Sequence, residues 1–317
     1  MYLQNKRVMV TGASGFLGAH LSALFVERGI ETFCAVRQES NTWRLKRLGI
    51  EHVVSLIPFD LQDRSSIVAA IEQCQPHVIV NCAAYGVDYR QQDYEAAILG
   101  NVQAVSWILE EAKQHKVERV IHVGTCYEYG AHDYPINEMA SLNPQGVYAA
   151  TKAAGSLIAL AQSKSSGQQL TVLRPFGMYG PLEGEHKFVP MLIKGCLANE
   201  KIELTLGKQL RDYIFVKDAA SAIVDVASLE NFPSQEVINV GSGKGLTLHE
   251  FGSRLQKLIG KGELNWGGRE YRPDEMMSVV ANVKKLASWI GCRQTIRLDE
   301  GLKVTLDEFI NRKEIYR

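Results

Sequence analysis

Residues 6–18 read KRVMVTGASGFLG, and this stretch decides the fold. KRVMVT is a strand-like apolar run, and residues 20–29, HLSALFVERG, repeat apolar side chains at the spacing of an amphipathic helix. Between the two lie Gly12, Gly15 and Gly18. Glycines let the backbone turn tightly and approach a pyrophosphate, which the positive end of the following helix stabilises. An ordinary strand–helix turn can carry three glycines, but this spacing and context predict a phosphate-binding turn.

The end of the second predicted strand bears on the identity of the ligand. In dinucleotide sites an acidic residue about 20 residues beyond the glycines binds the ribose of NAD, whereas an arginine there favours the 2′-phosphate of NADP. Arg37 takes this place after Gly18, with Arg44 and Lys46 close behind. We therefore predict NADP as the cofactor. NAD is the second choice, if Arg37 merely faces solvent and Glu39 serves the ribose.

The first 175 residues alternate apolar, β-branched runs with longer amphipathic stretches, which predicts a parallel sheet covered by helices on both faces. The predicted strands are 6–11, 31–36, 52–57, 77–82, 119–124 and 169–174, and the predicted helices are about 15–29, 63–74, 93–115 and 147–166. The fold class is therefore α/β, with a doubly wound parallel sheet of the Rossmann type. Ligands of such sheets bind at the carboxyl ends of the strands.

The regular alternation of predicted strands and helices ends after residue 174. A Pro- and Gly-rich loop leads to a helix near 188–198 and a short strand near 202–206, whereas 213–228 and 236–240 are interpreted as a return to the main sheet. Thr247 and Glu250 have the spacing of a capping box, which predicts a helix running to about 259. The chain is thus divided into a dinucleotide-binding domain and a smaller, interleaved α/β lobe. The domain comprises 1–176 and 213–240, and the lobe comprises 177–212 and 241–317.

Tyr148 and Lys152 occupy positions i and i+4 of one predicted helix, so their side chains share a face. A phenol, with a pKa of about 10, is a poor base at neutral pH, and a neighbouring ammonium favours its ionised form. Thr125 follows a predicted strand at its carboxyl end, where its hydroxyl can bond the same substrate oxygen. Tyr and Lys at this spacing are often unrelated surface residues. Their place after this strand predicts a proton-transfer site.

The composition sets limits on partners and location. Lys plus Arg and Asp plus Glu both number 35 among 317 residues, so no overall field favours nucleic acid or an anionic membrane. No apolar run approaches a membrane span, and the first residues do not read as a signal peptide. We expect a cytoplasmic protein. The six cysteines (34, 74, 82, 126, 196 and 292) lack metal-ligand spacing, so we expect reduced thiols and no metal site.

Together the motifs resemble the extended short-chain dehydrogenase/reductases that act on nucleotide-linked sugars. The resemblance spans nearly the whole chain and rests on TGASGFLG (11–18), DL (60–61), VNCAAYG (80–86), GTCYEYG (124–130), YAATK (148–152), LRPFGMYGP (173–181), GKQLRDYIFVKDAASAI (207–223), INVGSG (238–243) and RPDE (272–275). It implies an enzyme that binds a nucleotide-diphosphate sugar in its smaller lobe. It also implies a homodimer that pairs through the helices near 93–115 and 147–166.

The resemblance also implies roles for individual residues. Thr125, Tyr148 and Lys152 are then catalytic, with Asn101 in their neighbourhood. The implied cofactor-binding residues are Gly12, Ser14, Gly15, Phe16, Leu17, Gly18, Arg37, Asp60, Leu61, Ala83, Ala84, Tyr148, Lys152 and Pro175. The implied substrate-binding residues are Tyr85, Tyr127, Phe188, Val189, Arg211 and Arg272. The two arginines suit a diphosphate, because a guanidinium binds phosphate through two parallel hydrogen bonds.

Some positions depart from the family pattern. Sugar 4,6-dehydratases resemble one another in an acidic pair after the threonine, where this chain has Cys126 and Tyr127 before Glu128, so a dehydratase is disfavoured. Epimerase/reductases of the fucose type use a Cys and a His, to which Cys126 and His186 do not align cleanly. We expect Cys126 to be a buried, inert thiol. Gly177 stands where many relatives have an asparagine that contacts the sugar phosphates.

Two family reactions remain. A 4-ketoreductase transfers hydride from NADPH to C4 of a nucleotide-diphospho-4-keto-6-deoxyhexose, whereas a 4-epimerase retains NAD and oxidises and re-reduces the same carbon. Both use Tyr148 for proton transfer. Arg37 favours NADP and hence the ketoreductase, which is our prediction, with the NAD-dependent 4-epimerase as the alternative. A non-catalytic NADP(H)-sensing protein is a remote third reading, because the catalytic set is complete.

Overall fold

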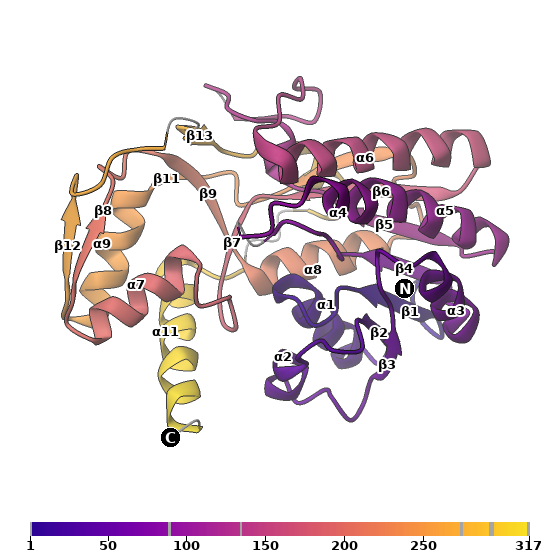
Figure 1. Ribbon diagram of the computed structural model, residues 1–317, viewed down its shortest axis with the longest axis horizontal. Helices are drawn as coiled ribbons and strands as arrows, with labels where there is room; N and C mark the ends of the chain where they lie inside the picture. Colours follow the sequence, from indigo (N-terminus) through magenta and orange to yellow (C-terminus); the bar gives the residue numbers. More distant parts are fainter. Residues whose placement is uncertain (1, 88–89, 134, 273–274, 292–294, 316–317) are drawn as a thin grey trace.

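The computed structural model describes residues 2–87, 90–133, 135–272, 275–291 and 295–315 (Figure 1). Parallel strands form the main sheet, in the order β10-β6-β5-β4-β1-β2-β3. Their bounds are Arg7–Thr11 (β1), Glu31–Val36 (β2), Ser55–Pro58 (β3), Val78–Asn81 (β4), Arg119–Val123 (β5), Gln169–Pro175 (β6) and Glu236–Val240 (β10). The strand order reverses between β1 and β4, which is where doubly wound sheets bind ligands. The predicted fold class is confirmed.

Helices cover both faces of this sheet (Figure 1). On one face lie α1 (Phe16–Glu27), α2 (Trp43–Arg47), α8 (Val216–Ala227) and α10 (Lys284–Ile290), and on the other α3 (Arg64–Cys74), α5 (Ala104–Gln114) and α6 (Gly146–Ser166). Alternate side chains of each strand enter the two cores: Val8 and Val10 join the first and Met9 the second. Burial on both sides explains why these strands are apolar throughout.

Four segments differ from the prediction. The helix α10, which the prediction assigned to the smaller lobe, packs on the main sheet. β3 begins at Ser55, because residues 51–53 form a turn. The helix expected over 93–115 is α4 (Tyr94–Ile98), a π-helical turn (Leu99–Gln103) and then α5. Residues 213–215 belong to the smaller sheet, where they pair with β7, so the return to the main sheet begins at α8.

The smaller lobe is built around β9 (Leu210–Phe215), which pairs with short strands from three other segments (Figure 1). These are β7 (Gly177–Tyr179), β11 (Gly245–Thr247) and β13 (Ser278–Val279). A separate pair joins β8 (Lys201–Leu204) to β12 (Glu263–Trp266). The helices α7 (Phe188–Leu197), α9 (Leu248–Ile259) and α11 (Leu298–Ile315) complete the lobe, which has its own hydrophobic core.

The capping box predicted before α9 is confirmed. The Glu250 amide donates to Thr247 Oγ1 at 3.1 Å, and the Thr247 amide donates to the Glu250 carboxylate at 2.9 Å. Each side chain thus satisfies an amide that the helix itself leaves without a partner.

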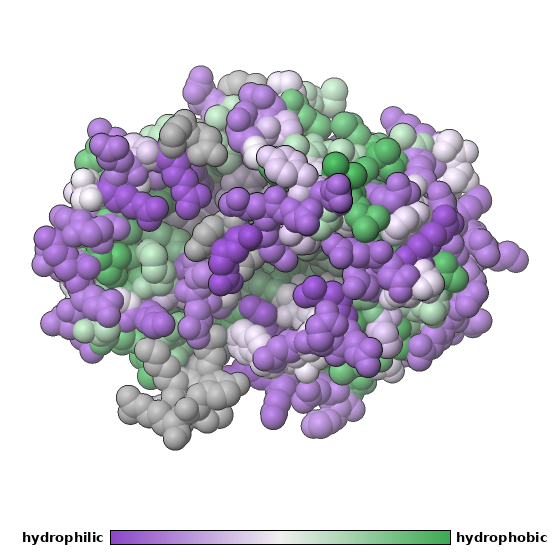
Figure 2. Space-filling view, in the orientation of Figure 1, coloured by the Kyte–Doolittle hydropathy of each residue, from purple (hydrophilic) through white to green (hydrophobic). Residues whose placement is uncertain are grey.

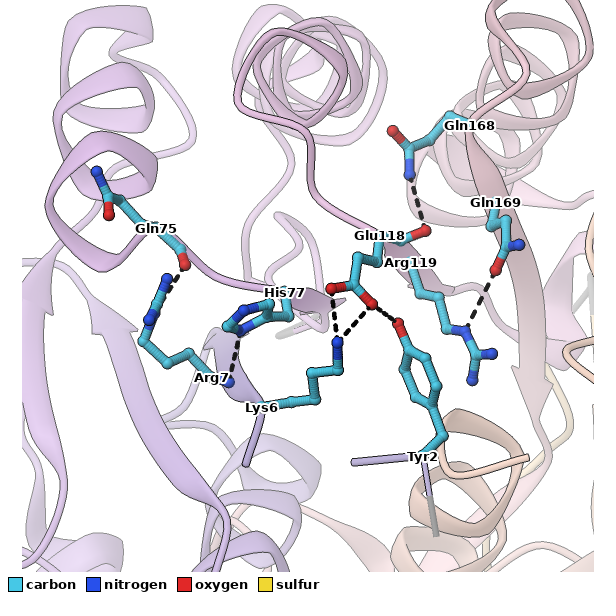
Figure 3. A network of polar contacts seen from close by, with 9 residues as sticks. All are labelled: Tyr2, Lys6, Arg7, Gln75, His77, Glu118, Arg119, Gln168 and Gln169. Carbon is cyan, nitrogen blue, oxygen red and sulfur yellow. Dashed lines mark hydrogen bonds and ion pairs between the residues drawn. The ribbon is translucent and has the colours of Figure 1, made fainter. Parts of the chain in front are cut away.

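A polar network ties the first residues of the chain to the amino-terminal edge of the main sheet (Figure 3). Lys6 Nζ donates to both carboxylate oxygens of Glu118, at 2.7 and 2.9 Å, and the Tyr2 hydroxyl donates to the same carboxylate. The Arg119 guanidinium lies 3.2 Å from the centroid of the Tyr2 ring and donates to Gln169 Oε1 at 3.2 Å. This edge is opposite the carboxyl ends of the strands, so the network supports the sheet away from the expected ligand site.

Within the part of the chain that the structure describes, no helix has the length and apolarity to cross a bilayer. The same residues contain no group of three His, Cys, Asp or Glu side chains that could hold a metal ion. The cysteines at 34, 74, 82, 126 and 196 are free thiols, and Cys292 lies outside the described residues. Figure 2 shows hydrophilic side chains spread over most of the face in view, with apolar ones in smaller areas between them.

Candidate active site

Close backbone contacts require the glycines of the turn between β1 and α1. Gly12 has a φ of +65°, and a Cβ there would lie 2.9 Å from backbone atoms of Ala83. At Gly18, a Cβ would lie 2.3 Å from the carbonyl oxygen of Gly12. No side chain caps the start of α1 at Gly15, so the amides from Phe16 onward can bind an anion. These features fit the pyrophosphate of a nicotinamide dinucleotide.

A buried polar chain under the turn joins β1, β4 and β5. Thr11 Oγ1 donates to Asn81 Oδ1 at 2.6 Å and accepts from the Ala83 amide at 3.1 Å, and Asn81 Nδ2 lies 3.2 Å from His122 Nδ1. Burial lowers the pKa of His122 well below its usual value, so this ring is neutral. The chain places Ala83, followed by Ala84, at the glycine turn.

Two arginines lie at the end of the site where the adenosine half of a dinucleotide is expected. Arg37 follows β2 and is largely exposed, with its Nε 3.7 Å from Glu39 Oε1. Arg44 lies closer to the turn: its Nε donates to the carbonyl oxygen of Leu182 at 2.8 Å and its Nη1 to that of Ser14 at 3.1 Å. Sequence reasoning gave Arg44 only a supporting charge. The structure ties it directly to the glycine-rich turn.

The other predicted cofactor residues lie after β3 and β6. Asp60 shapes its own turn, since its Oδ1 accepts from the Gln62 amide at 2.9 Å and its amide donates to Ser66 Oγ at 2.8 Å. Leu61 packs against the core on the α3 and α5 side. Pro175 is buried at the carboxyl end of β6.

Thr125, Tyr148 and Lys152 meet at the carboxyl end of β5. A side-chain hydrogen bond joins Thr125 to Tyr148, and the buried Lys152 Nζ donates to the carbonyl oxygen of Val123 at 2.8 Å. Gly86, from the loop after β4, packs on Tyr148, because a Cβ there would lie 3.3 Å from the Tyr148 Cβ. The structure therefore brings the three predicted catalytic residues together.

Burial is the main influence on the titration of these groups. It raises the pKa of Tyr148 above its usual value, and the hydrogen bond with Thr125 is the influence that lowers it. Burial lowers the pKa of Lys152, whereas the charge of Glu128 favours its ammonium form. We expected Lys152 to hold the Tyr148 pKa down. In the structure the Lys152 ammonium donates to the Val123 carbonyl, and its effect on the Tyr148 pKa stays a prediction.

The π-helical turn directs Asn101 toward this region. Asn101 Oδ1 accepts from the Tyr85 amide at 2.8 Å, and its Nδ2 donates to the Tyr85 carbonyl and to Thr151 Oγ1, both at 2.9 Å. The Asn101 carbonyl passes so close to α6 that a Cβ at Gly155 would lie 2.1 Å from its oxygen. Such turns occur frequently at functional sites. Here the turn clamps the Tyr85 loop to the helix that carries Tyr148.

The Glu128 carboxylate is hydrogen-bonded to other groups of the protein and does not replace the acidic pair of a dehydratase. Its Oε1 accepts from the Thr125 amide at 2.9 Å and from Ser156 Oγ at 3.0 Å, and its Oε2 accepts from Arg174 Nε at 2.7 Å. The side chains of Glu128 and Arg174 are almost completely buried. Cys126 is buried, and burial raises the pKa of its thiol to about 12, which agrees with the expectation of a buried, inert thiol. Sequence reasoning missed the Glu128–Arg174 pair.

Residues from the turn after β5, from β9 and at positions 272 and 275 come together on the substrate side. Burial raises the pKa of Tyr127, and Arg211, Glu275 and Arg272 also act on it, so these side chains are neighbours. Arg211 Nη2 donates to Glu275 Oε1 at 2.7 Å. The next residue, Asp212, is buried and accepts from three backbone amides, at 2.7–3.1 Å, which fixes β9 beneath Arg211.

Two other predicted substrate residues have different surroundings. Val189 is buried in the core of the smaller lobe, so its side chain packs away from the residues above. Phe188 is half-buried and packs against Phe251, with ring centroids 6.3 Å apart. A Cβ at Gly177 would lie 2.8 Å from the carbonyl oxygen of Asp212. The close approach of β7 and β9 thus leaves little room for a side chain at this position.

The loop 181–187 makes contacts that no sequence pattern indicated. Its carbonyl oxygens accept from Arg44 at 2.8 Å and lie 3.0 Å from His20 Nε2 on α1. Lys187 Nζ donates to the carbonyl oxygen of Val87 at 2.9 Å. The loop therefore connects the smaller lobe to α1, to α2 and to the segment after β4, which are the walls of the candidate cofactor site.

A doubly wound sheet with a glycine-rich turn at its switch point, beside a Thr–Tyr–Lys cluster, defines a class of dinucleotide-dependent enzyme. The family model described as the NAD dependent epimerase/dehydratase family matches residues 8–241. The chain therefore belongs to the NAD dependent epimerase/dehydratase family, and the resemblance inferred from its motifs is confirmed.

Individual relatives agree with this assignment. The chain is 31% identical to the dTDP-glucose 4,6-dehydratase of Mycolicibacterium smegmatis over 225 residues, which are 68% of this chain and 67% of that one. The solved UDP-glucose 4-epimerase of Thermus thermophilus, in complex with NAD, is 26% identical with a TM-score of 0.85, covering 96% and 99% of the two chains. MoeE5, solved with UDP-glucuronic acid and NAD, is 27% identical with a TM-score of 0.84, covering 97% and 99%.

Proposed function

We propose that the protein reduces the C4 ketone of a nucleotide-diphospho-4-keto-6-deoxyhexose with NADPH. The observation that carries the proposal is the placement of the Tyr148 phenol beside Thr125 and Lys152 at the carboxyl end of β5, where burial further favours its protonated form. A reductase needs a proton donor before turnover, whereas an epimerase begins by removing a proton from a sugar hydroxyl. Glu128 supplies no acid for a dehydration, because Arg174, Ser156 and the Thr125 amide occupy its carboxylate.

The arginines at the adenosine end support NADP as the preferred cofactor, with NAD second. Arg37 is exposed and its contact with Glu39 is long, at 3.7 Å, so its guanidinium can turn toward a 2′-phosphate. Arg44 adds a second cation beside Ser14. A phosphate carries a charge of about −1.5 to −2 at pH 7, and a guanidinium matches its oxygens geometrically.

Tyr148, Thr125 and Lys152 have different roles in the reduction. Tyr148 donates its hydroxyl proton to the carbonyl oxygen at C4, which Thr125 orients by a hydrogen bond. NADPH, when bound, supplies the hydride that adds to the C4 carbon. Lys152 binds the nicotinamide ribose and stabilises the phenolate that remains on Tyr148, until a proton from solvent restores the phenol. The sugar gains one hydride and one proton and becomes the C4 alcohol.

The substrate side suits a nucleoside diphosphate. Arg211 and Arg272 bind its phosphates, and Arg211 exchanges its 2.7 Å contact with Glu275 for phosphate oxygens. Tyr127 is close to both arginines and can contact the sugar in the site. The similarity to MoeE5, which was solved with UDP-glucuronic acid, supports a nucleotide sugar as the substrate class.

A 4-epimerase that retains NAD is the second candidate, favoured by the similarity to the T. thermophilus UDP-glucose 4-epimerase and its NAD complex. The test supplies nucleotide-linked 4-keto-6-deoxyhexoses and follows the absorbance of NADPH. Consumption of NADPH with one of them supports the reductase. Failure with every ketone, together with interconversion of UDP-sugars without added cofactor, reverses the choice.

We also propose a homodimer through α4–α5 and α6. Apolar side chains on these helices face outward: Tyr94 is 69% exposed, Ile98 54% and Leu157 55%. Such side chains suit an interface between copies. Light scattering on the eluting protein should give twice the mass of one chain, and the mass of a single chain would refute the dimer.

A further inference from the structure

We propose that Glu128 is a positioning residue, whose buried carboxylate locks Thr125 to helix α6 and places a negative charge near Lys152. The inference rests on the proton-transfer role proposed for Tyr148. It extends that role, because it assigns a task in the reaction to a residue outside the Thr–Tyr–Lys cluster. It also accounts for an acid that is displaced from the dehydratase pattern.

The first link holds the backbone of Thr125. A short 3₁₀ turn, Cys126–Glu128, follows Thr125, and the Glu128 Oε1 accepts from the Thr125 amide at 2.9 Å. In return, Thr125 Oγ1 accepts from the Tyr127 amide at 3.4 Å. The two ends of the turn are thus joined reciprocally, as in a capping box. The direction of the Thr125 hydroxyl therefore depends on Glu128.

The second link holds the helix that carries Tyr148. Ser156 Oγ donates to the same Glu128 oxygen at 3.0 Å. Ser156 follows Lys152 by one helical turn and Tyr148 by two, so the three side chains share a face of α6. One carboxylate oxygen therefore bonds both the Thr125 backbone and this helix. Together with the Lys152 contact to Val123, it sets the distance between the Thr125 and Tyr148 hydroxyls.

The surroundings of Glu128 are built for a charged side chain. Arg174 Nε donates to its Oε2 at 2.7 Å, and the Arg174 guanidinium carbon lies 4.5 Å from the centroid of the Tyr129 ring. Without such a partner a buried carboxylate would be strongly destabilising. A Cβ at Gly124 would lie 2.3 Å from the Glu128 Oε1, so any side chain there would displace the carboxylate. Glycine at 124 and glutamate at 128 are therefore required together.

The charge of Glu128 acts on both titrating groups of the cluster. The titratable groups that interact with Lys152 or Tyr148 follow β4 or lie in β5 and the turn after it: Cys82, His122, Cys126, Tyr127 and Glu128. Arg174, on β6, is paired with Glu128. Burial raises the pKa of both thiols to about 12, raises that of Tyr127 and lowers that of His122, so these four are uncharged at neutral pH. Glu128 is then the anion that favours the protonated forms of Lys152 and Tyr148.

The test separates the geometric effect from the charge effect. Ser156→Ala deletes one hydroxyl and keeps the ion pair, so kcat should fall about tenfold while the alkaline limb of its pH profile stays in place. Glu128→Gln also removes the charge. Its kcat should fall about 100-fold, and its alkaline limb should move by about one pH unit to lower pH, because Lys152 and Tyr148 then lose protons more easily. The Kd of NADPH should change less than about threefold in both variants.

Glu111→Gln is the matched control. Glu111 is also a buried carboxylate, 3.7 Å from Arg64, but it lies on α5 away from the cluster. This variant should keep the wild-type kcat and pH profile. Equal losses in Glu111→Gln and Glu128→Gln would reduce the effect to destabilisation and overturn the proposal, as would an unshifted alkaline limb in a folded Glu128→Gln protein. If Glu128→Gln does not fold, a wild-type kcat in Ser156→Ala overturns it.

The outcome stays distinct from that of the proposed function. If the wild-type enzyme does not oxidise NADPH with any keto sugar, kcat is measured instead for inversion of UDP-sugars at C4, which uses the same three residues. The reductase proposal then fails, while the proposal for Glu128 is still decided by the two variants and the control.

Discussion

Replacing Gly18 by alanine perturbs the cofactor turn by a single methyl group. That methyl would lie 2.3 Å from the carbonyl oxygen of Gly12, 2.9 Å from its carbon and 3.0 Å from the Cα of Ala13. These are backbone atoms of the turn, so no side-chain rotation can relieve the contact. Since non-bonded heavy atoms settle at about 3.5 Å, the turn must move by about 1 Å relative to α1.

The size of the effect follows from the hydrogen bonds that such a shift breaks. Each charge-assisted hydrogen bond from a turn amide to the pyrophosphate contributes about 1.5–3 kcal/mol. Loss of two of them costs about 3–6 kcal/mol, so the affinity for the dinucleotide should fall at least about 100-fold. The fold itself should persist, because the core strands are not touched.

The assay is a fluorescence titration of NADPH against wild type, Gly18→Ala and Gly29→Ala. Gly29 lies beyond the other end of the same helix, where a Cβ meets nothing within 4 Å although φ is +71°. Gly29→Ala should therefore lose about 1 kcal/mol of stability and keep its affinity for NADPH. Wild-type affinity in Gly18→Ala, or an equal loss in both variants, would refute the placement of the pyrophosphate at this turn.

Three further predictions concern single side chains. Arg37→Gln should lower the preference for NADPH over NADH about tenfold in kcat/KM. The attraction between a unit charge and a phosphate about 4 Å away in water contributes about 1–2 kcal/mol. An unchanged preference would show that Arg37 is not part of the cofactor site. Arg211→Met should raise KM for the nucleotide sugar at least about tenfold with little change in kcat, and the reverse pattern would contradict its role as a phosphate ligand. Burial raises the pKa of Glu183 from 4.5 to about 8, so the folded state favours its protonated form. The stability that the protonated Glu183 confers is complete below about pH 4.5 and is lost as pH rises through about 8. Glu183→Gln should therefore melt at a higher temperature than wild type at pH 9 but not at pH 5. If the melting temperatures of the two proteins change in parallel with pH, the effect is excluded.

The fold of the first 175 residues could be predicted because strand and helix periodicities there agree with the glycine turn. The strands are apolar on both sides, as helices on both faces require. β9 was harder to place. Its residues 213–215 are as apolar as a main-sheet strand, and only pairing with β7, β11 and β13 assigns β9 to the smaller sheet. The π-helical turn at 99–103 leaves no periodic signal, because one widened turn barely alters the helical pattern.

The candidate site was predictable where function depends on local spacing. Tyr148 and Lys152 are one helical turn apart, and Thr125 ends a recognisable strand, so their meeting follows from the fold. The support of Thr125 by Glu128 and Arg174 depends on side chains from separate elements, and a buried ion pair has no sequence pattern. For the same reason the contact of Arg44 with the Ser14 carbonyl emerged only from the structure.

The most direct test of the whole account is Tyr148→Phe, which removes one hydroxyl and preserves the ring that packs on Gly86. NADPH should bind with a Kd within about threefold of wild type while turnover falls by at least about 100-fold, since the proton donor is gone. Turnover within tenfold of wild type, with the cofactor still bound, would show that the proton reaches the substrate from another group.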